Sequence, residues 1–149
     1  MSVHPYDPVS RVMSWPVATI DIDATLEEAA EALAADNIGV LLVLRDGRLA
    51  GIVSERDVVV HVAAGANLSH LAVGDVMAGD LVTTPSETPI VGAARLMSEA
   101  DVRHLPILDD HLIAGLVSIR DLLPVLAEGL DEGEVIVVPN GARVVVRSS

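Results

Sequence analysis

The apolar residues in the first half of the chain recur at two different periods. A helical period predicts two helices, at 25–36 and 55–64. Thr25 and Glu28 form the pattern of a capping box at the start of the first helix, and Gly65 ends the second. Short apolar runs predict three strands, at 17–20, 40–44 and 49–53. Asp46–Gly47 between the last two strands predicts a hairpin turn, so the predicted order is β-α-β-β-α.

The same order of elements returns 64 residues later. This shift places Val12–Met13 on Val76–Met77 and Gly51–Asp57 on Gly115–Asp121 without a gap. The second copy predicts strands at 81–84, 104–108 and 112–117, and helices at 89–100 and 119–128, with Pro89 in the first helical turn. Because one copy alone buries little surface, we expect the two to pack face to face around a pseudo-twofold axis.

The repeat divides the chain into five predicted segments. They are an N-terminal tail (1–11), repeat 1 (12–65), a linker (66–75), repeat 2 (76–129) and a C-terminal tail (130–149). In the C-terminal tail, residues 134–138 and 143–147 predict a hairpin around an Asn-Gly turn. A lone hairpin is marginal in water, so it should pack on the module, extend a sheet or pair with another chain.

The composition narrows the possible functions. Apolar residues make up 51% of the chain, which excludes disorder, and the absence of cysteine excludes disulfides and thiolate sites. A net charge of −13 disfavours nucleic acid and anionic membrane surfaces as partners. The longest apolar run, 38–44, is too short to span a bilayer, and residues 1–13 lack the pattern of a signal peptide. We therefore expect a cytoplasmic protein.

Each copy closes on a serine, an arginine and an aspartate at the start of its last helix. Ser54 and Asp57 can simply cap this helix. The same turn can also bind a ligand, because helix N–H groups and Arg56 suit a phosphate and an ionised aspartate can accept both hydroxyls of a ribose. The residues alone leave both interpretations open. The second copy repeats the set with Ser118, Arg120 and Asp121.

The tandem unit, the Val-Met pair opening each copy and the closing motif resemble CBS domains, which occur in pairs called Bateman modules. The resemblance covers residues 12–123. It implies an α/β fold of two β-α-β-β-α repeats, followed here by the hairpin. It also implies a sensor that binds an adenosine-containing ligand (AMP, ADP, ATP, S-adenosylmethionine or NAD) in clefts between the copies and changes a partner protein. No catalytic domain accompanies the pair, so the resemblance is to a stand-alone regulatory module.

The resemblance also implies roles for single residues. Asp57 and Asp121 would hold ribose, Ser54 and Ser118 would reach ribose or phosphate, and strand residues would meet the adenine edge with backbone groups. The predicted site residues of the second copy are Thr83, Thr84, Arg103, His104, Pro106, Ser118, Arg120 and Asp121. Those of the first copy are Thr19, Ile20, Ser54, Arg56 and Asp57.

The two predicted sites differ in charge. Arg103 and His104 can add positive charge near phosphates, whereas the first copy has Gly39 and Val40 there, and Leu42 where the family often has proline. The Asp121 site is therefore expected to accept a charged tail. The Asp57 site is either empty or suits a less charged ligand.

No catalytic set or metal-ligand spacing is present in the sequence, so we expect neither an enzyme nor a required cofactor. The alternative function is a ligand-free dimerisation or interaction scaffold. Residues 58–62 and 122–126 carry more apolar side chains than one buried helix stripe needs. This surplus predicts helix-to-helix contact in a homodimer, unless the tails of the chain cover it.

Overall fold

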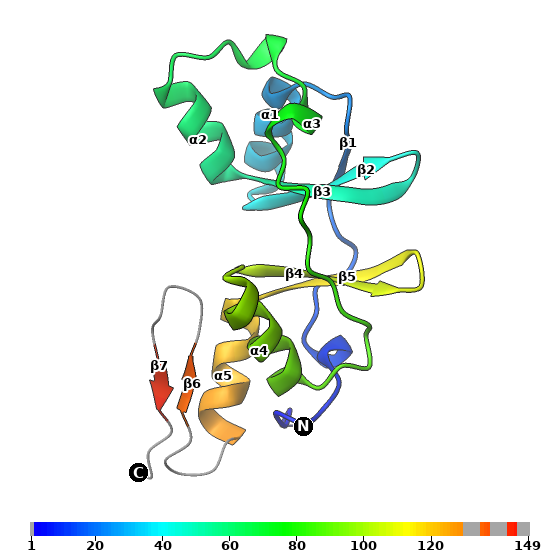
Figure 1. Ribbon diagram of the computed structural model, residues 1–149, viewed down its shortest axis with the longest axis vertical. Helices are drawn as coiled ribbons and strands as arrows, with labels where there is room; N and C mark the ends of the chain where they lie inside the picture. Colours follow the sequence, from blue (N-terminus) through cyan, green and yellow to red (C-terminus); the bar gives the residue numbers. More distant parts are fainter. Residues whose placement is uncertain (1, 130–134, 138–142, 146–149) are drawn as a thin grey trace. The chain divides into compact units, whose positions relative to one another are not determined.

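The structure is a computed structural model that describes residues 2–129, 135–137 and 143–145 (Figure 1). Contacts divide the chain into a first unit, Val17–Leu81, and a second unit, which combines Met1–Pro16 with Val82–Ser149. These units do not coincide with the sequence repeats, because the N-terminal segment belongs with the second repeat. No helix in the described ranges is long and apolar enough to cross a bilayer.

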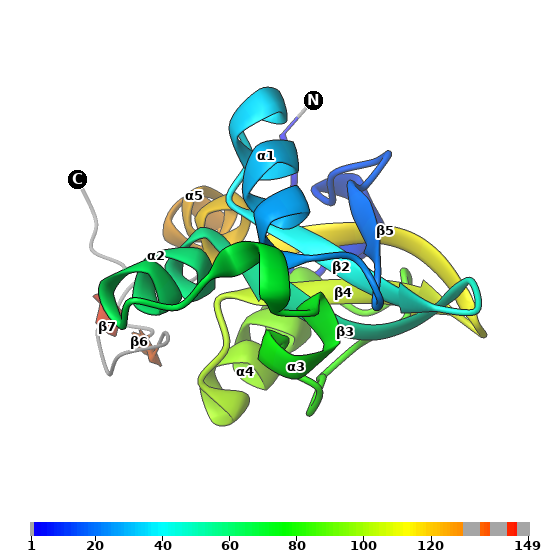
Figure 2. The same ribbon diagram turned by 90° about the horizontal axis from the view of Figure 1, so that it is seen from above.

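The first unit is a three-stranded sheet with helices packed on it. Its elements are β1 (Thr19–Asp21), α1 (Leu26–Asp36), β2 (Val40–Arg45), β3 (Arg48–Ser54), α2 (Glu55–Ala63), a 3-10 turn η2 (Leu68–His70) and α3 (Val73–Val76). Strand β1 runs parallel to β2, and β2 runs antiparallel to β3. Figures 1 and 2 show α3 beside β3. The core contains Leu26, Ala29, Leu33, Leu41, Val43, Val53 and Val73.

Local signals placed the elements of the first unit correctly. Thr25 caps α1, its hydroxyl accepting a hydrogen bond from the Glu28 N–H at 3.1 Å. Asp46 and Gly47 both have positive φ, at 52° and 80°, which is the backbone of a two-residue hairpin turn. The helices, strands 40–44 and 49–53 and the hairpin predicted from the sequence are therefore confirmed.

The second unit repeats this plan with a shorter sheet. Its elements are a 3-10 turn η1 (Val9–Arg11), α4 (Ile90–Ala100), β4 (His104–Asp109), β5 (Leu112–Ser118), α5 (Ile119–Gly129), β6 (Val135–Val137) and β7 (Arg143–Val145). Strands β4 and β5 are antiparallel. The core contains residues of η1, α4, both strands and α5: Val9, Ile90, Ala93, Ala94, Met97, Leu105, Ile107, Val117, Leu122 and Leu126 among them.

The strand predicted at 81–84 is wrong: only Thr84 pairs, through an isolated bridge to Ile107. In the first unit, the Leu42 N–H donates to the Ala18 carbonyl and extends the pairing of β1. The equivalent residue in the second unit is Pro106, which has no N–H to donate. Beyond Thr84, the Ser86 N–H donates to the Asp109 side chain at 3.0 Å. The segment therefore lacks the ladder bonds on both sides of Thr84 that β1 makes through Ala18 and Ile22.

The N-terminal segment completes the second unit. Pro89 is the N-cap of α4 and not a first-turn residue as predicted, and its side chain makes no capping bond. The carbonyls of Asp7 and Pro5 accept the first N–H groups of α4, from Ile90 and Val91, both at 2.9 Å. The N-terminal segment therefore replaces a side-chain cap, because these N–H groups have no partner within the helix.

The Val-Met pair that opens each sequence repeat packs on the glycine of the closing motif of the other repeat. Ser14 exchanges two backbone hydrogen bonds with Leu116, at 2.8 and 3.1 Å, and Ala78 exchanges two with Ile52, at 2.9 and 3.1 Å. A Cβ on Gly115 would overlap Met13, and a Cβ on Gly51 would overlap Met77. Glycine therefore permits the close approach of these segments.

The predicted C-terminal hairpin is confirmed for its described strands. Strands β6 and β7 pair antiparallel in a sheet of their own, with Ile136 opposite Val144. Strand β6 contacts α4, and β7 contacts α5. Of the three expected placements, packing on the helices is therefore the one the structure shows. The predicted Asn-Gly turn lies outside the described residues.

Candidate functional site

The turn between β3 and α2 holds Asp57 in a fixed position. Ser54 is extended and is the N-cap of α2, and its hydroxyl oxygen accepts a bond from the Asp57 N–H at 3.3 Å. In return, Oδ2 of Asp57 accepts the Ser54 N–H at 2.7 Å and the Ser54 hydroxyl at 3.0 Å. These bonds form a complete capping box, so the interpretation of Ser54 and Asp57 as helix caps is right about the local structure.

The turn between β5 and α5 repeats the two bonds that its aspartate accepts. Oδ2 of Asp121 accepts the Ser118 N–H at 2.8 Å and the Ser118 hydroxyl at 3.0 Å. Within the described ranges, Oδ1 of Asp57 and Oδ1 of Asp121 accept no hydrogen bond and no side chain pairs with them. Each half-buried carboxylate therefore keeps one acceptor oxygen that its cap does not use.

The helix starts offer fewer N–H groups to a phosphate than the sequence suggests. The Glu55 N–H donates to the Gly39 carbonyl, and the Ile119 N–H donates to the Arg103 carbonyl, both at 3.0 Å. The side chains of Arg56 and Arg120, in the first turn of each helix, are exposed. A phosphate at either turn would therefore depend on arginine side chains more than on backbone groups.

A backbone donor and acceptor for an adenine edge are present at Thr19 but not at Ile20 or Thr84, and Thr83 lies outside any strand. The parallel ladder uses Ala18, Ile20 and Ile22, so the backbone N–H and C=O of Thr19 face the open edge of the sheet. Thr84 is 6% exposed, and its N–H and C=O bond to Pro106 and Leu108 at 3.3 and 3.0 Å. Its hydroxyl contacts that of Thr88 at 2.6 Å.

Burial is the largest influence on the titration of His104 in the second turn. Burial lowers the pKa of His104 below its ordinary value of 6.5; the Asp121 carboxylate acts to raise the pKa, and Arg103 acts to lower it. In the free protein the imidazole is therefore neutral at neutral pH, and Arg103 carries the positive charge beside it. Arg103 itself is exposed, and Pro106 is a buried strand residue paired with Leu116.

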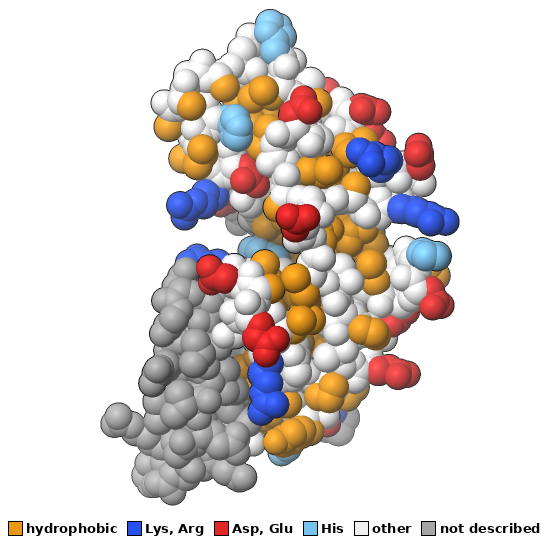
Figure 3. Space-filling view, in the orientation of Figure 1, with side chains coloured by type: hydrophobic (Ala, Val, Ile, Leu, Met, Phe, Trp, Pro, Cys, Tyr) orange, Lys and Arg blue, Asp and Glu red, His pale blue; other side chains and the backbone are white. Residues whose placement is uncertain are grey.

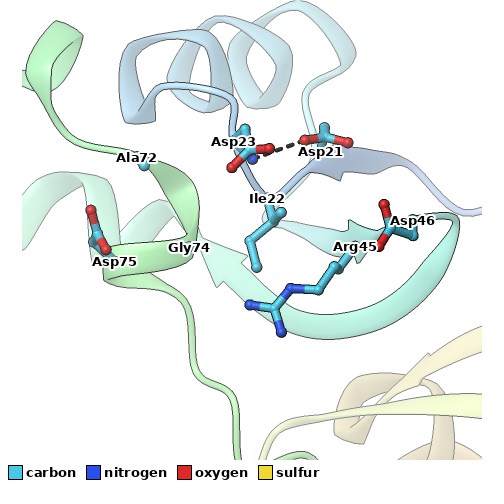
Figure 4. Close-up of a pocket in the computed structure, with 8 residues that line it drawn as sticks. All are labelled: Asp21, Ile22, Asp23, Arg45, Asp46, Ala72, Gly74 and Asp75. Atoms are coloured by element: carbon cyan, nitrogen blue, oxygen red, sulfur yellow. Dashed lines mark hydrogen bonds between the residues drawn. The ribbon is translucent and has the colours of Figure 1, made fainter.

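The first unit also contains a hollow that the sequence did not predict. It has a volume of about 360 Å³ and lies at the end of β1, away from the Ser54 turn (Figure 4). Asp21 is joined there to the Asp23 N–H at 2.9 Å, and the Arg45 side chain extends below Ile22. The lining residues are Asp21, Ile22, Asp23, Arg45, Asp46, Ala72, Gly74 and Asp75. They come from three separate segments, so no local motif marks them.

Comparisons with known proteins agree with this architecture. The sequence matches the family described as CBS domain twice, over residues 9–64 and 73–128. The CBS domain-containing protein YhcV of Bacillus subtilis is 31% identical over 114 residues, which cover 76% of this chain and 81% of YhcV. The crystal structure of the CBS domain NE2398 is 35% identical, with a TM-score of 0.67, and the match covers 73% of this chain and 86% of that one.

A second solved structure shares the fold at lower identity. The CBS domain pair of protein MJ0100, solved in complex with 5′-methylthioadenosine and S-adenosyl-L-methionine, is 24% identical with a TM-score of 0.73. The match covers 82% of this chain and 97% of that one. Two α/β repeats, each closed by a helix whose first-turn aspartate bonds the serine before it, define the class of protein as a tandem repeat module. The chain belongs to the CBS-domain family.

Proposed function

We propose that this chain is a regulatory module that binds an adenosine-containing ligand at its Ser-x-Arg-Asp turns and transmits the change to a partner protein. The observation that carries the proposal is the carboxylate of each turn. The capping bonds fix Oδ2 of Asp57 and of Asp121, while Oδ1 keeps its lone pairs for a ribose diol. A carboxylate held in place in this way binds without first losing conformational freedom.

Two further observations support an adenosine compound. The backbone of Thr19, and by the repeat that of Thr83, presents a donor and an acceptor, the pair of groups an adenine edge can bond. The MJ0100 pair holds two adenosine compounds. At 24% identity, that likeness supports only the capacity of the fold for such ligands.

The turn between β5 and α5, which is the second turn, suits a phosphorylated ligand better than the turn between β3 and α2. Arg103 and Arg120 place two guanidinium groups on the segments that flank Ser118, whereas the first turn has Gly39 at the position of Arg103. Guanidinium groups bind phosphate through paired hydrogen bonds. We therefore propose that the turn with Asp121 binds a ligand that has a charged phosphate tail, and that the turn with Asp57 binds a less charged ligand.

A thermal-shift panel tests the proposal. AMP, ADP, ATP, S-adenosylmethionine and NADH are added to the full chain, and a ligand at about 100 times its Kd should stabilise the folded state by about 2.7 kcal/mol. Asp121→Asn should remove the response to phosphorylated ligands. The matched control is Glu99→Gln, which removes the same charge from an exposed position on α4. No response to any ligand would contradict the proposal.

The second candidate function is assembly, favoured by the surface of α2. This helix has no buried residue, and its Val59, Val60 and Val62 are 64%, 52% and 58% exposed. Figure 3 shows hydrophobic side chains at the surface over α2. Its counterpart α5 buries Leu122 and Leu126 and lies beside β7. The additional apolar side chains predicted on α5 are thus largely covered within its own unit. We therefore propose a homodimer that forms through α2.

Light scattering of the full chain at micromolar concentration tests this interface. Val59→Asp should shift the mass from dimer to monomer, because it places a charge in the apolar contact. The control is Leu112→Asp, which alters a 75% exposed leucine on β5 and should leave the mass unchanged. A monomeric mass for the unmodified chain would contradict the dimer.

A further inference from the structure

His104 belongs to the same cluster as the second turn. It begins β4 opposite Ser118 in β5. The neighbouring residues Arg103 and Ile119 are joined by a bond from the Ile119 N–H to the Arg103 carbonyl at 3.0 Å. Bonded and non-bonded pairs alternate in an antiparallel ladder, so His104 and Ser118 form a non-hydrogen-bonded pair. Side chains of such pairs lie close together on one face of the sheet. His104 therefore neighbours the hydroxyl that donates to Asp121.

The first unit has the same backbone with different chemistry. Val40 begins β2 opposite Ser54, and the Glu55 N–H bonds to the Gly39 carbonyl at 3.0 Å. Val40 is buried and cannot titrate. The chain therefore contains a natural reference for His104, in which the same turn is built with an aliphatic side chain.

Few charged groups surround His104 in its unit. Asp121 on α5 acts to raise its pKa, Arg103 before β4 acts to lower it, and burial, the larger effect, lowers it. Strand β5 contributes the neutral hydroxyl of Ser118, and α4 contributes buried apolar residues such as Ala94 and Met97. In the free protein, the half-buried imidazole is therefore neutral and lies close to a carboxylate.

We propose that His104 is a specificity-determining residue, which takes up a proton when a phosphate binds at the Asp121 turn and so favours phosphorylated over unphosphorylated adenosine ligands. The inference rests on the function proposed above. The phosphate dianion enters with both charges, one proton moves from the buffer to a ring nitrogen, and the imidazolium then faces the phosphate. The opposite charge favours this protonated form. The Asp57 turn, with Val40, binds without a proton.

Isothermal titration calorimetry of the full chain with AMP and with adenosine tests the inference. Each ligand is titrated at about pH 7.5 in two buffers of different ionisation enthalpy, where the AMP phosphate, with a second pKa of about 6, is mostly dianionic. AMP should bind with net uptake of up to one proton, and adenosine with none. The Kd for AMP should fall with falling pH, by no more than about tenfold per pH unit.

Variants assign the proton to His104. His104→Val reproduces Val40, and His104→Gln keeps a polar side chain in case valine disturbs folding; both should bind AMP more weakly and without proton uptake. Asp57→Ala should keep the uptake, since it alters the other turn. Nuclear magnetic resonance titration of the wild-type His104 ring should show a low pKa that rises when AMP is added.

Three results separate the two proposals. AMP binding with equal heats in both buffers would overturn the role of His104 and leave the proposed function intact. Proton uptake that persists in both His104 variants would likewise overturn it. Absence of binding by AMP and adenosine alike would overturn both the ligand-binding function and the role of His104 that rests on it.

Discussion

At the scale of residues, one aspartate oxygen stabilises a helix and the other remains available. The capping bonds of Ser54 and Ser118 use Oδ2 alone. A capping serine and a first-turn carboxylate are ordinary helix signals, which is why the sequence could not separate a cap from a ligand turn. The structure shows that the two roles use different atoms and are therefore compatible.

The titration of His104 gives the pH dependence of stability a definite direction. Because its pKa is lowered in the folded chain, the unfolded chain binds the proton first as the pH falls. The neutral His104 therefore contributes to the free energy of unfolding above about pH 6.5. This contribution is lost progressively as the pH falls from there to the lower pKa of the folded chain. We expect urea unfolding at about pH 7.5 and about pH 5.5 to show a smaller loss of stability for His104→Val than for the wild type.

Asp109 also has a shifted pKa, but it does not titrate in the pH range of this experiment. Hydrogen bonds from the backbone and side chain of Ser86 lower the pKa of Asp109, so this carboxylate stays ionised and its contribution is lost only at much lower pH. An equal loss of stability in the wild type and His104→Val between the two pH values would contradict the assignment to His104.

At the scale of elements, prediction succeeded where the signal was local. The periods of α1 and α4, the Asp46–Gly47 turn and the Ser54 cap lie within a few consecutive residues. It failed where the partner is distant in sequence. The strand predicted at 81–84 depends on whether residue 106 can donate a hydrogen bond, and the place of the N-terminal segment depends on Leu116.

The placement of the N-terminal segment can be tested with one core residue. Val9 is fully buried in the core of the second unit, so Val9→Ala should destabilise that unit by about 2 kcal/mol. Hydrogen exchange should accelerate in β4 and β5 more than in β2 and β3. The matched control is Leu112→Ala, which shortens a 75% exposed leucine on β5 and should leave both units unchanged. Faster exchange confined to β2 and β3 would contradict the assignment.

At the scale of the whole molecule, charge is the dominant surface property. The net charge of the chain is −13, and Arg11 and Asp7 form an ion pair at 3.1 Å. Self-repulsion of like charges destabilises a compact state, and salt screens it. Composition alone predicted this excess, whereas the hollow beside Arg45 was unpredictable because only the fold assembles its lining.

Salt should therefore stabilise the protein. The thermal midpoint is expected to rise by a few degrees between about 0.01 M and 0.3 M sodium chloride, because the Debye length shortens from about 30 Å to well under 10 Å. Sodium sulfate is unsuitable, since it strengthens apolar burial as well. A midpoint that falls over this range would show that attractive pairs outweigh repulsion.

The place of the N-terminal segment in the second unit also limits the order in which the units can fold during synthesis. The first unit is one continuous stretch, Val17–Leu81, and can close as soon as it has left the ribosome. The opening residues emerge earlier still, yet Leu116 and the start of α4, which they bond, are made only later. Residues 5–14 therefore cannot reach their place, and Val9 cannot be buried, until β5 has been translated.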